Sequence, residues 1–133
     1  MKLARAFLLA AAALLAVLPA HAFSVDLPDF DRLERQLKLR PAQKAQYYAA
    51  VGATKRALMS VALAGLEIKE RLAEEFSKPR PDLNALYQAH DVLVMQSAPL
   101  FREAHDEWSR LYAMMDADQV AIAKSYLRDL LPR

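Results

Sequence analysis

The longest pattern of apolar positions in the chain runs from Pro41 to Phe76. Apolar or small residues recur there at every third or fourth position, at Tyr47, Val51, Thr54, Leu58, Val61, Gly65, Ile68, Leu72 and Phe76. Such spacing is typical of one face of an α-helix. At about 1.5 Å per residue this helix is roughly 50 Å long, too long to be covered by the small remainder of the chain.

A second long helix is predicted from Leu83 to Met114. Its apolar stripe comprises Leu83, Leu86, His90, Leu93, Ser97, Leu100, Ala104, Trp108, Leu111 and Met115. The segment between the two helices contains Pro79 and Pro81, which cannot continue a helix, and Asp82 can cap the next one. Because the two helices have similar lengths, they are expected to form an antiparallel hairpin. Pro99 predicts a kink in the second helix.

Shorter patterns flank the hairpin. Phe30, Leu33 and Leu37 predict a helix from Leu27 to Lys38, and Val120, Ala123, Leu127 and Leu130 predict a last helix that ends at Pro132. The fold class is therefore all-α, with four helices in the order short, long, long, short, built on a long antiparallel α-hairpin that we expect to be dimeric.

The starts of two helices carry capping residues. Pro41 after Leu39-Arg40 suits the first helical position, and Gln43 can accept from the Arg40 backbone N–H, although Arg40 itself is a poor cap. Asp116 and Gln119 form a capping box at the last helix. Further along the first long helix, Glu67, Arg71 and Glu75 have the i,i+4 spacing of ion pairs on a solvated face.

The first 22 residues have the organisation of a secretory signal peptide. Lys2 and Arg5 precede an apolar run over residues 7–18, and Ala20-His21-Ala22 is a small-x-small cleavage site. We expect cleavage after Ala22, one helical-hairpin domain over residues 23–133, and no membrane span after cleavage, since the apolar run is shorter than the ~20 residues that cross a bilayer.

Removal of this segment changes the charge balance. The chain has 18 Lys+Arg and 16 Asp+Glu, and the loss of Lys2 and Arg5 leaves 16 of each. A formally neutral chain gives no electrostatic basis for nucleic-acid binding. No cysteine is present, so disulfides and thiolate chemistry are excluded.

The middle of the first long helix is apolar or small on nearly every side from Ala57 to Leu66. A helix on the surface of a monomer is expected to be polar on its outer half. We therefore expect this segment to be shared with a second copy of the chain, with another protein, or with both. The candidate contact residues outside the hairpin-facing stripe are Tyr48, Lys55, Arg56, Met59 and Leu63. Enclosure of residues 58–66 by the chain's own helices would remove this expectation.

Catalytic and metal sites have less support in the sequence. His90 and His105 lie roughly 22 Å apart along one helix, so they cannot share an ion. His90 falls on the apolar stripe and is expected in the core, whereas His105 is expected at a partly exposed position. Carboxylate pairs such as Glu74-Glu75 are typical of solvated faces. Trp108, with Phe101 and Tyr112, is expected in the core. The sequence thus predicts a protein that is not an enzyme and has no metal or cofactor.

Both helix starts resemble a known motif. Residues 37–44 (LKLRPAQK) and 112–119 (YAMMDADQ) are similar to the paired L-T-x-x-Q motifs of the Spy/CpxP family of periplasmic proteins. Arg40 stands where the first motif has Thr, and Met115-Asp116 where the second has Leu-Thr. The resemblance implies a cradle-shaped, often dimeric hairpin that holds unfolded proteins without ATP, or that restrains an envelope stress sensor.

These features together predict a periplasmic, ATP-independent chaperone-like protein. Its partners would be unfolded or partly folded envelope proteins, called clients below, and a second copy of the chain. The alternative is an accessory regulator that binds the periplasmic domain of a sensor kinase in envelope stress signalling. A lesser alternative is a periplasmic metal-binding sensor.

Overall fold

The computed structural model describes residues 28–130. In this part of the chain it consists of α2 (Phe30–Leu37), α3 (Pro41–Phe76), α4 (Leu83–Ala113) and α5 (Ala117–Leu130), with no strand. The predicted all-α class and the short, long, long, short order are confirmed. The signal peptide predicted for residues 1–22 and the end of the last helix at Pro132 lie outside the described residues.

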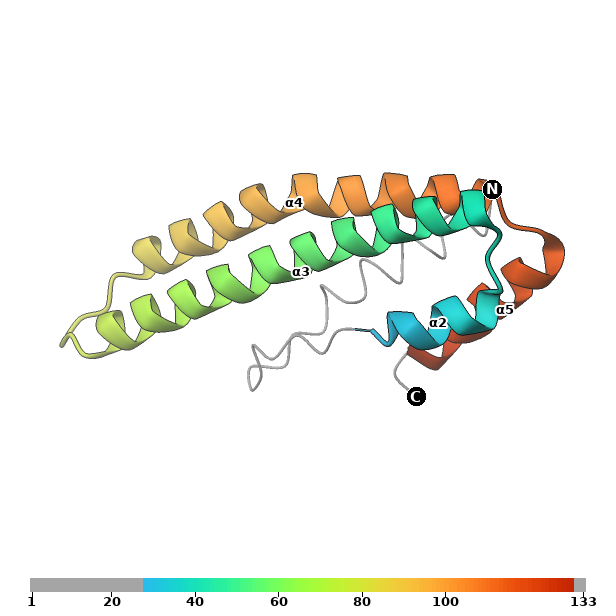
Figure 1. Ribbon diagram of the computed structural model, residues 1–133. Coiled ribbons are helices and arrows are strands. Elements are labelled where there is room, and N and C mark those ends of the chain that lie inside the picture. Colours follow the sequence, from blue (N-terminus) through green and yellow to red (C-terminus); the bar gives the residue numbers. More distant parts are fainter. Residues whose placement is uncertain (1–27, 131–133) are drawn as a thin grey trace.

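Helices α3 and α4 pack antiparallel along their lengths (Figure 1). Gln46 of α3 contacts Glu107 of α4, and Arg56, further along α3, contacts Glu103. Residue numbers therefore rise along α3 as they fall along α4. Helix α4 remains helical through Pro99, and Figure 1 shows it bending partway along its length, as expected where a proline removes a backbone hydrogen bond.

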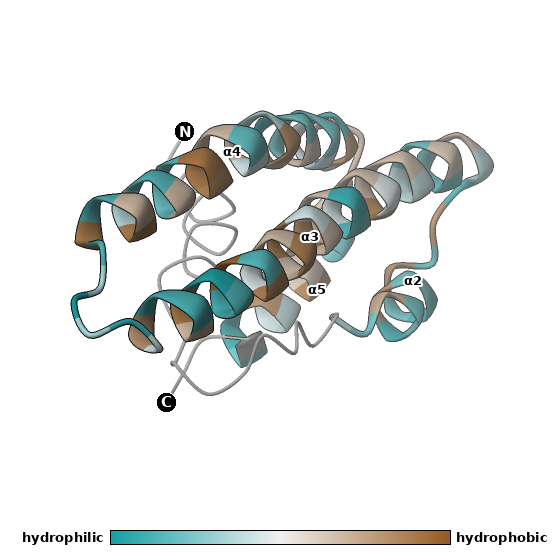
Figure 2. Ribbon diagram, turned by 90° about the vertical axis from the view of Figure 1, so that its left-hand side faces the viewer, coloured by the Kyte–Doolittle hydropathy of each residue, from teal (hydrophilic) through white to brown (hydrophobic). Residues whose placement is uncertain are grey.

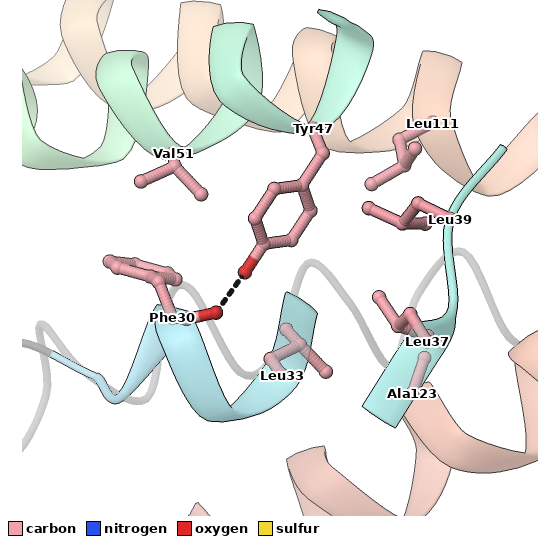
Figure 3. Close-up of a cluster of buried hydrophobic side chains, with 8 residues drawn as sticks. All are labelled: Phe30, Leu33, Leu37, Leu39, Tyr47, Val51, Leu111 and Ala123. Carbon is pink, nitrogen blue, oxygen red and sulfur yellow. Dashed lines mark hydrogen bonds between the residues drawn. The ribbon is translucent and has the colours of Figure 1, made fainter. Parts of the chain in front are cut away.

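Helices α2 and α5 pack against each other beneath one end of the hairpin, called the base here, where α3 begins and α4 ends (Figure 1). The main apolar cluster lies at this end (Figure 3) and consists of Phe30, Leu33, Leu37, Leu39, Tyr47, Val51, Leu111 and Ala123. Trp108 packs against the cluster, stacked on Phe30 with ring centroids 6.2 Å apart. Its indole N–H donates to Thr54 Oγ1 over 2.8 Å. The expectation that Trp108 belongs to the core is confirmed.

Helix α2 begins later than predicted. Its N-cap is Asp29, whose carboxylate accepts from the Arg32 N–H over 2.9 Å, so the helix starts at Phe30 and not at Leu27. The helix ends at Leu37 because Lys38 adopts a left-handed conformation with φ 48°. The chain then turns through the buried Leu39 into α3.

The opposite end of the hairpin, called the tip here, holds a buried carboxylate. Arg71 and Glu67 form the expected i,i+4 ion pair at 3.0 Å, but Glu75 does not belong to that solvated face. One Glu75 oxygen accepts from Lys78 Nζ over 2.5 Å, and the other accepts from the Asp82 backbone N–H over 2.8 Å. These hydrogen bonds hold the pKa of Glu75 below its ordinary value and raise the pKa of Lys78.

The apolar stripes predicted for the long helices are wrong near the tip. Phe76, Leu83 and His90 were expected on buried faces, and all three are exposed. Among the described helices, α2 and α5 pack beneath the base only. On α4, Ala89 and Leu93 turn toward α3, so His90, about 100° further round the helix, faces outward.

Candidate functional site

Helix α3 carries a line of exposed residues on the side that faces away from α4. This line, called the outer stripe here, comprises Tyr48, Lys55, Met59, Leu63 and Leu66. Ala50 and Ala57 are fully buried. Met59 comes nine residues after Ala50, and Leu66 comes nine residues after Ala57, which is two and a half helical turns in each case. They therefore point to the opposite side of the helix. Met59, Leu63 and Leu66 are 52% to 60% exposed, so the middle of α3 is not enclosed by the described helices.

The five predicted contact residues are all exposed, but two of them already have partners within the chain. The Tyr48 hydroxyl donates to Glu34 of α2 over 2.5 Å, and this hydrogen bond raises the pKa of Tyr48. Arg56 leans toward α4 and pairs with Glu103 at 2.7 Å. The side chains of Lys55, Met59 and Leu63 make no hydrogen bond or ion pair among the described residues. These three are the predicted residues that remain available to another polypeptide.

A second exposed apolar area lies toward the tip and was missed by sequence analysis. This tip surface consists of Phe76, Leu83, Tyr87 and Val94, each about half exposed or more. On α3, Phe76 lies about eight helical turns after Tyr47, so the two side chains share one face of that helix. On α4, Leu83 lies about seven turns before Trp108 and shares its face. At the base these two faces pack on α2. Figure 2 shows apolar residues among polar ones along α3 and α4. The tip surface could not be foreseen because the periodicity alone placed Phe76 and Leu83 in the core.

A shallow cavity of about 180 Å³ opens between the two long helices. Its apolar floor comes from Ala64 and Ile68 of α3 and from Ala89, Val92 and Leu93 of α4. The rim carries Arg71, paired with Glu67, and the amides of Gln88 and Gln96. A cavity of about 150 Å³ can hold a benzene-sized group, so this one has room for a single apolar side chain.

The capping residues at the base form a larger network than predicted. Gln43 Oε1 accepts from the Arg40 N–H over 2.9 Å, and Asp116 and Gln119 form the expected reciprocal capping box. In addition, the Gln43 and Gln119 amides donate to each other over 2.8 and 3.0 Å. Each also donates to a helix-end carbonyl, of Met114 and Leu37 respectively. Both side chains are buried, so this network joins the ends of all four described helices.

The two histidines within the described residues, His90 and His105, lie apart on α4. His90 was expected in the core, but its side chain is 67% exposed and approaches Asp91 at 3.7 Å. His105 is half-buried, as expected, and approaches Asp106 at 3.4 Å. Among the described residues, no group of three or more His, Cys, Asp and Glu residues is placed to hold a metal ion.

Comparison with known proteins gave no match to a family model and no significant match to a curated protein or a solved structure. Membership of the Spy/CpxP family therefore stays a prediction from the two motifs.

Within the described residues, α3 is the one helix long and apolar enough to cross a membrane by length and composition. In its most apolar window 39% of the residues are buried inside the molecule. Core helices of water-soluble proteins pass the same test. This result reflects the apolar middle of α3 and does not show where the chain is located.

Proposed function

We propose that the protein is an ATP-independent chaperone-like protein of the periplasm that holds exposed apolar segments of unfolded or partly folded clients. The observation that carries this proposal is the set of large apolar side chains left exposed along the hairpin. Ten of them among the described residues are about half exposed or more: Tyr48, Met59, Leu63, Leu66, Phe76, Leu83, Tyr87, Val92, Val94 and Met95. Extended exposed apolar surface is typical of protein–protein interaction sites.

The arrangement of these side chains favours clients without a fixed shape. The tip surface runs over both helices, and exposed charged residues such as Lys69 and Asp91 lie on the same two helices. Apolar contact supplies binding energy at roughly 25 cal/mol per Å² buried, while the charges keep the surface soluble. Met59 and Met95 add flexible side chains that adapt to different partners. The cavity between α3 and α4 can take one apolar side chain of a bound segment.

The mechanism we propose is holding, with no catalytic step and no cofactor. A client binds while its apolar segments are exposed, and it dissociates when folding buries them. The base of the hairpin, closed by the apolar cluster and the two glutamines, keeps the helices in place as clients bind.

The experiment that tests this function is suppression of aggregation of several unrelated denatured proteins by near-stoichiometric amounts of the purified protein. The variant Tyr87→Ser/Val94→Ser removes apolar area from the tip surface without touching the base. It should require at least about fivefold more protein for equal protection, since loss of two anchoring side chains costs 1 kcal/mol or more. Ala117→Ser/Ala121→Ser, on exposed positions of α5, is the matched control.

A protein that protects no client would contradict the proposal. Inactivity in this assay combined with tight binding to the periplasmic domain of one sensor kinase would support the regulatory alternative. The metal-sensor alternative is tested by titration, and affinity in the micromolar range or tighter that His90→Ala/His105→Ala abolishes would support it.

A further inference from the structure

The cavity between α3 and α4 opens on the side of the hairpin opposite the tip surface. On α3, Glu67 at the rim comes nine residues before Phe76. On α4, Val92 in the floor comes nine residues after Leu83. Nine residues make two and a half helical turns, so each pair points to opposite sides of its helix. The cavity is therefore separate from the tip surface, to which Phe76 and Leu83 belong.

Two small side chains in the floor leave the cavity hollow. Ala64 of α3 and Ala89 of α4 each contribute only a methyl group, whereas Ile68 and Leu93 contribute larger apolar walls. The volume of about 180 Å³ exceeds the ~150 Å³ that holds a benzene molecule. A phenylalanine ring or a leucine side chain fills this space, and an alanine methyl group leaves most of it empty. The size favours one bulky apolar group.

The rim of the cavity has no net charge. Arg71 is paired with Glu67 at 3.0 Å, so its charge is already balanced and gives little attraction to an anionic ligand. The amides of Gln88 and Gln96 complete the polar part of the rim. Each amide carries both a donor and an acceptor, and neither makes a hydrogen bond among the described residues. Such a rim complements a peptide unit, which is uncharged and also both donates and accepts.

The spacing of the two amides fits an extended chain. Gln88, Val92 and Gln96 follow one another at intervals of four residues, so they lie along one side of α4. The two glutamines are about 12 Å apart along the helix axis at 1.5 Å per residue. A strand covers about 3.3 Å per residue, so roughly four residues reach from one amide to the other. A residue in the middle of that segment lies over the apolar floor.

Building on the chaperone function proposed above, we propose that the cavity binds one bulky apolar residue, phenylalanine or leucine in size, of an extended and locally uncharged client segment. The Gln88 and Gln96 amides bind peptide units on either side of that residue. Clients are selected at this site by the size of one side chain and by the absence of charge beside it, whereas the tip surface supplies less selective apolar contact.

NMR titration with short capped peptides tests this selectivity. The neutral peptide acetyl-Ser-Phe-Ser-Ser-amide should bind at least about tenfold more tightly than its counterpart with alanine in place of phenylalanine, because only the phenyl ring fills the cavity. Peptides whose serines are replaced by glutamate or by lysine should bind no more tightly than the neutral one. The side-chain amide signals of Gln88 and Gln96 should shift on binding, and that of Gln36, exposed on α2, should not.

Variants of the lining residues locate the binding. Ala64 is half-buried, so Ala64→Leu fills the cavity from its open side and should weaken binding of the phenylalanine peptide at least about fivefold. Ala73→Leu makes the same change at an exposed position of α3 outside the cavity and should have no effect. Gln88→Met/Gln96→Met keeps the side-chain length but removes the hydrogen bonds, and should weaken binding about fivefold. Circular dichroism shows that each variant remains helical.

Several results would overturn the inference. These are equal binding of the phenylalanine and alanine peptides, tighter binding of a charged peptide, and parental affinity in Ala64→Leu or in the double glutamine variant. The aggregation assay is independent of all of them. A protein that protects clients but does not distinguish the peptides would refute only the cavity site, and one that binds the phenylalanine peptide but protects no client would refute only the proposed function.

Discussion

Gln43 and Gln119 each make several hydrogen bonds that connect different helices. Each caps its own helix, each donates to a carbonyl at the end of another helix, and the two amides bind each other. A buried polar group is tolerated only when its hydrogen bonds are made, and here both amides are satisfied. The two glutamines, which belong to the segments that resemble a family motif, thus hold the helix ends together at the base of the hairpin.

Removal of either glutamine should destabilise the fold strongly. Gln43→Ala leaves the Arg40 N–H and part of the Gln119 amide without partners, and the Met114 carbonyl keeps only the Arg40 guanidinium as a side-chain donor. We expect a loss of about 3 kcal/mol in the free energy of unfolding. The double variant with Gln119→Ala should lose less than the sum of the two single losses, with a coupling of about 1 kcal/mol or more. Urea denaturation of the four proteins measures this. Strict additivity would show that the amides act independently.

Tyr47 is expected to make the stability of the core sensitive to alkaline pH. Its hydroxyl donates to the Phe30 carbonyl over 2.5 Å (Figure 3), and burial raises its pKa well above the ordinary value of 10.0. A pKa raised by folding contributes stability that is present below the unfolded pKa and is lost as pH rises through the folded one. We therefore expect the melting temperature to fall above about pH 10.

Tyr47→Phe should remove part of that alkaline loss and cost about 1–3 kcal/mol at neutral pH, because the Phe30 carbonyl loses its donor. Thermal melts at neutral and alkaline pH, with exposed Tyr87→Phe as control, measure both effects. Equal alkaline loss in the parent and in Tyr47→Phe would assign the loss to other groups.

At the scale of the elements, the helices were predictable and their outward faces were not. Pro41 marks one helix start through its fixed backbone, and Asp82 and Asp116 mark two more through carboxylates that accept from backbone N–H groups. The structure places the starts at those positions. The faces of Phe76, Leu83 and His90 depended on how far α2 and α5 extend beneath the hairpin. Local periodicity contains no information on that extent, so sequence analysis placed all three in the core.

The connection at the tip should weaken in acid. Glu75 accepts from Lys78 and from the Asp82 N–H, which lower its pKa below the ordinary value of 4.5. A lowered pKa contributes stability that is present above the unfolded value and is lost as pH falls through the folded one. Glu75→Gln should therefore lower the melting temperature at about pH 7, and the difference from the parent should shrink toward about pH 3.

Glu74→Gln, at the exposed neighbouring position, is the control for that measurement. The melting temperatures of the three proteins at both pH values provide the comparison. A difference between the parent and Glu75→Gln that stays constant with pH would show that the Glu75 charge does not stabilise the tip.

At the scale of the whole molecule, the base and the rest of the hairpin have different characters. The base has a packed apolar cluster and a satisfied polar network. Toward the tip, apolar side chains remain exposed on both long helices. The sequence predicted this division in part, since residues 57–66 are too apolar for an outer surface. The exposure of Met59 and Leu63 was predicted in this way. The exposure of Tyr87 and Val94 is evident only from the structure of the hairpin.

The most direct test of this account is photo-crosslinking from the tip surface to an unfolded client. A photo-reactive side chain in place of Tyr87 should crosslink to several unrelated denatured proteins and lose those crosslinks when the clients fold. The same group in place of Ala121 on α5 should give few crosslinks. Absence of crosslinks from position 87, or equal yields from both positions, would contradict the claim that the exposed apolar surface of the hairpin binds other polypeptides.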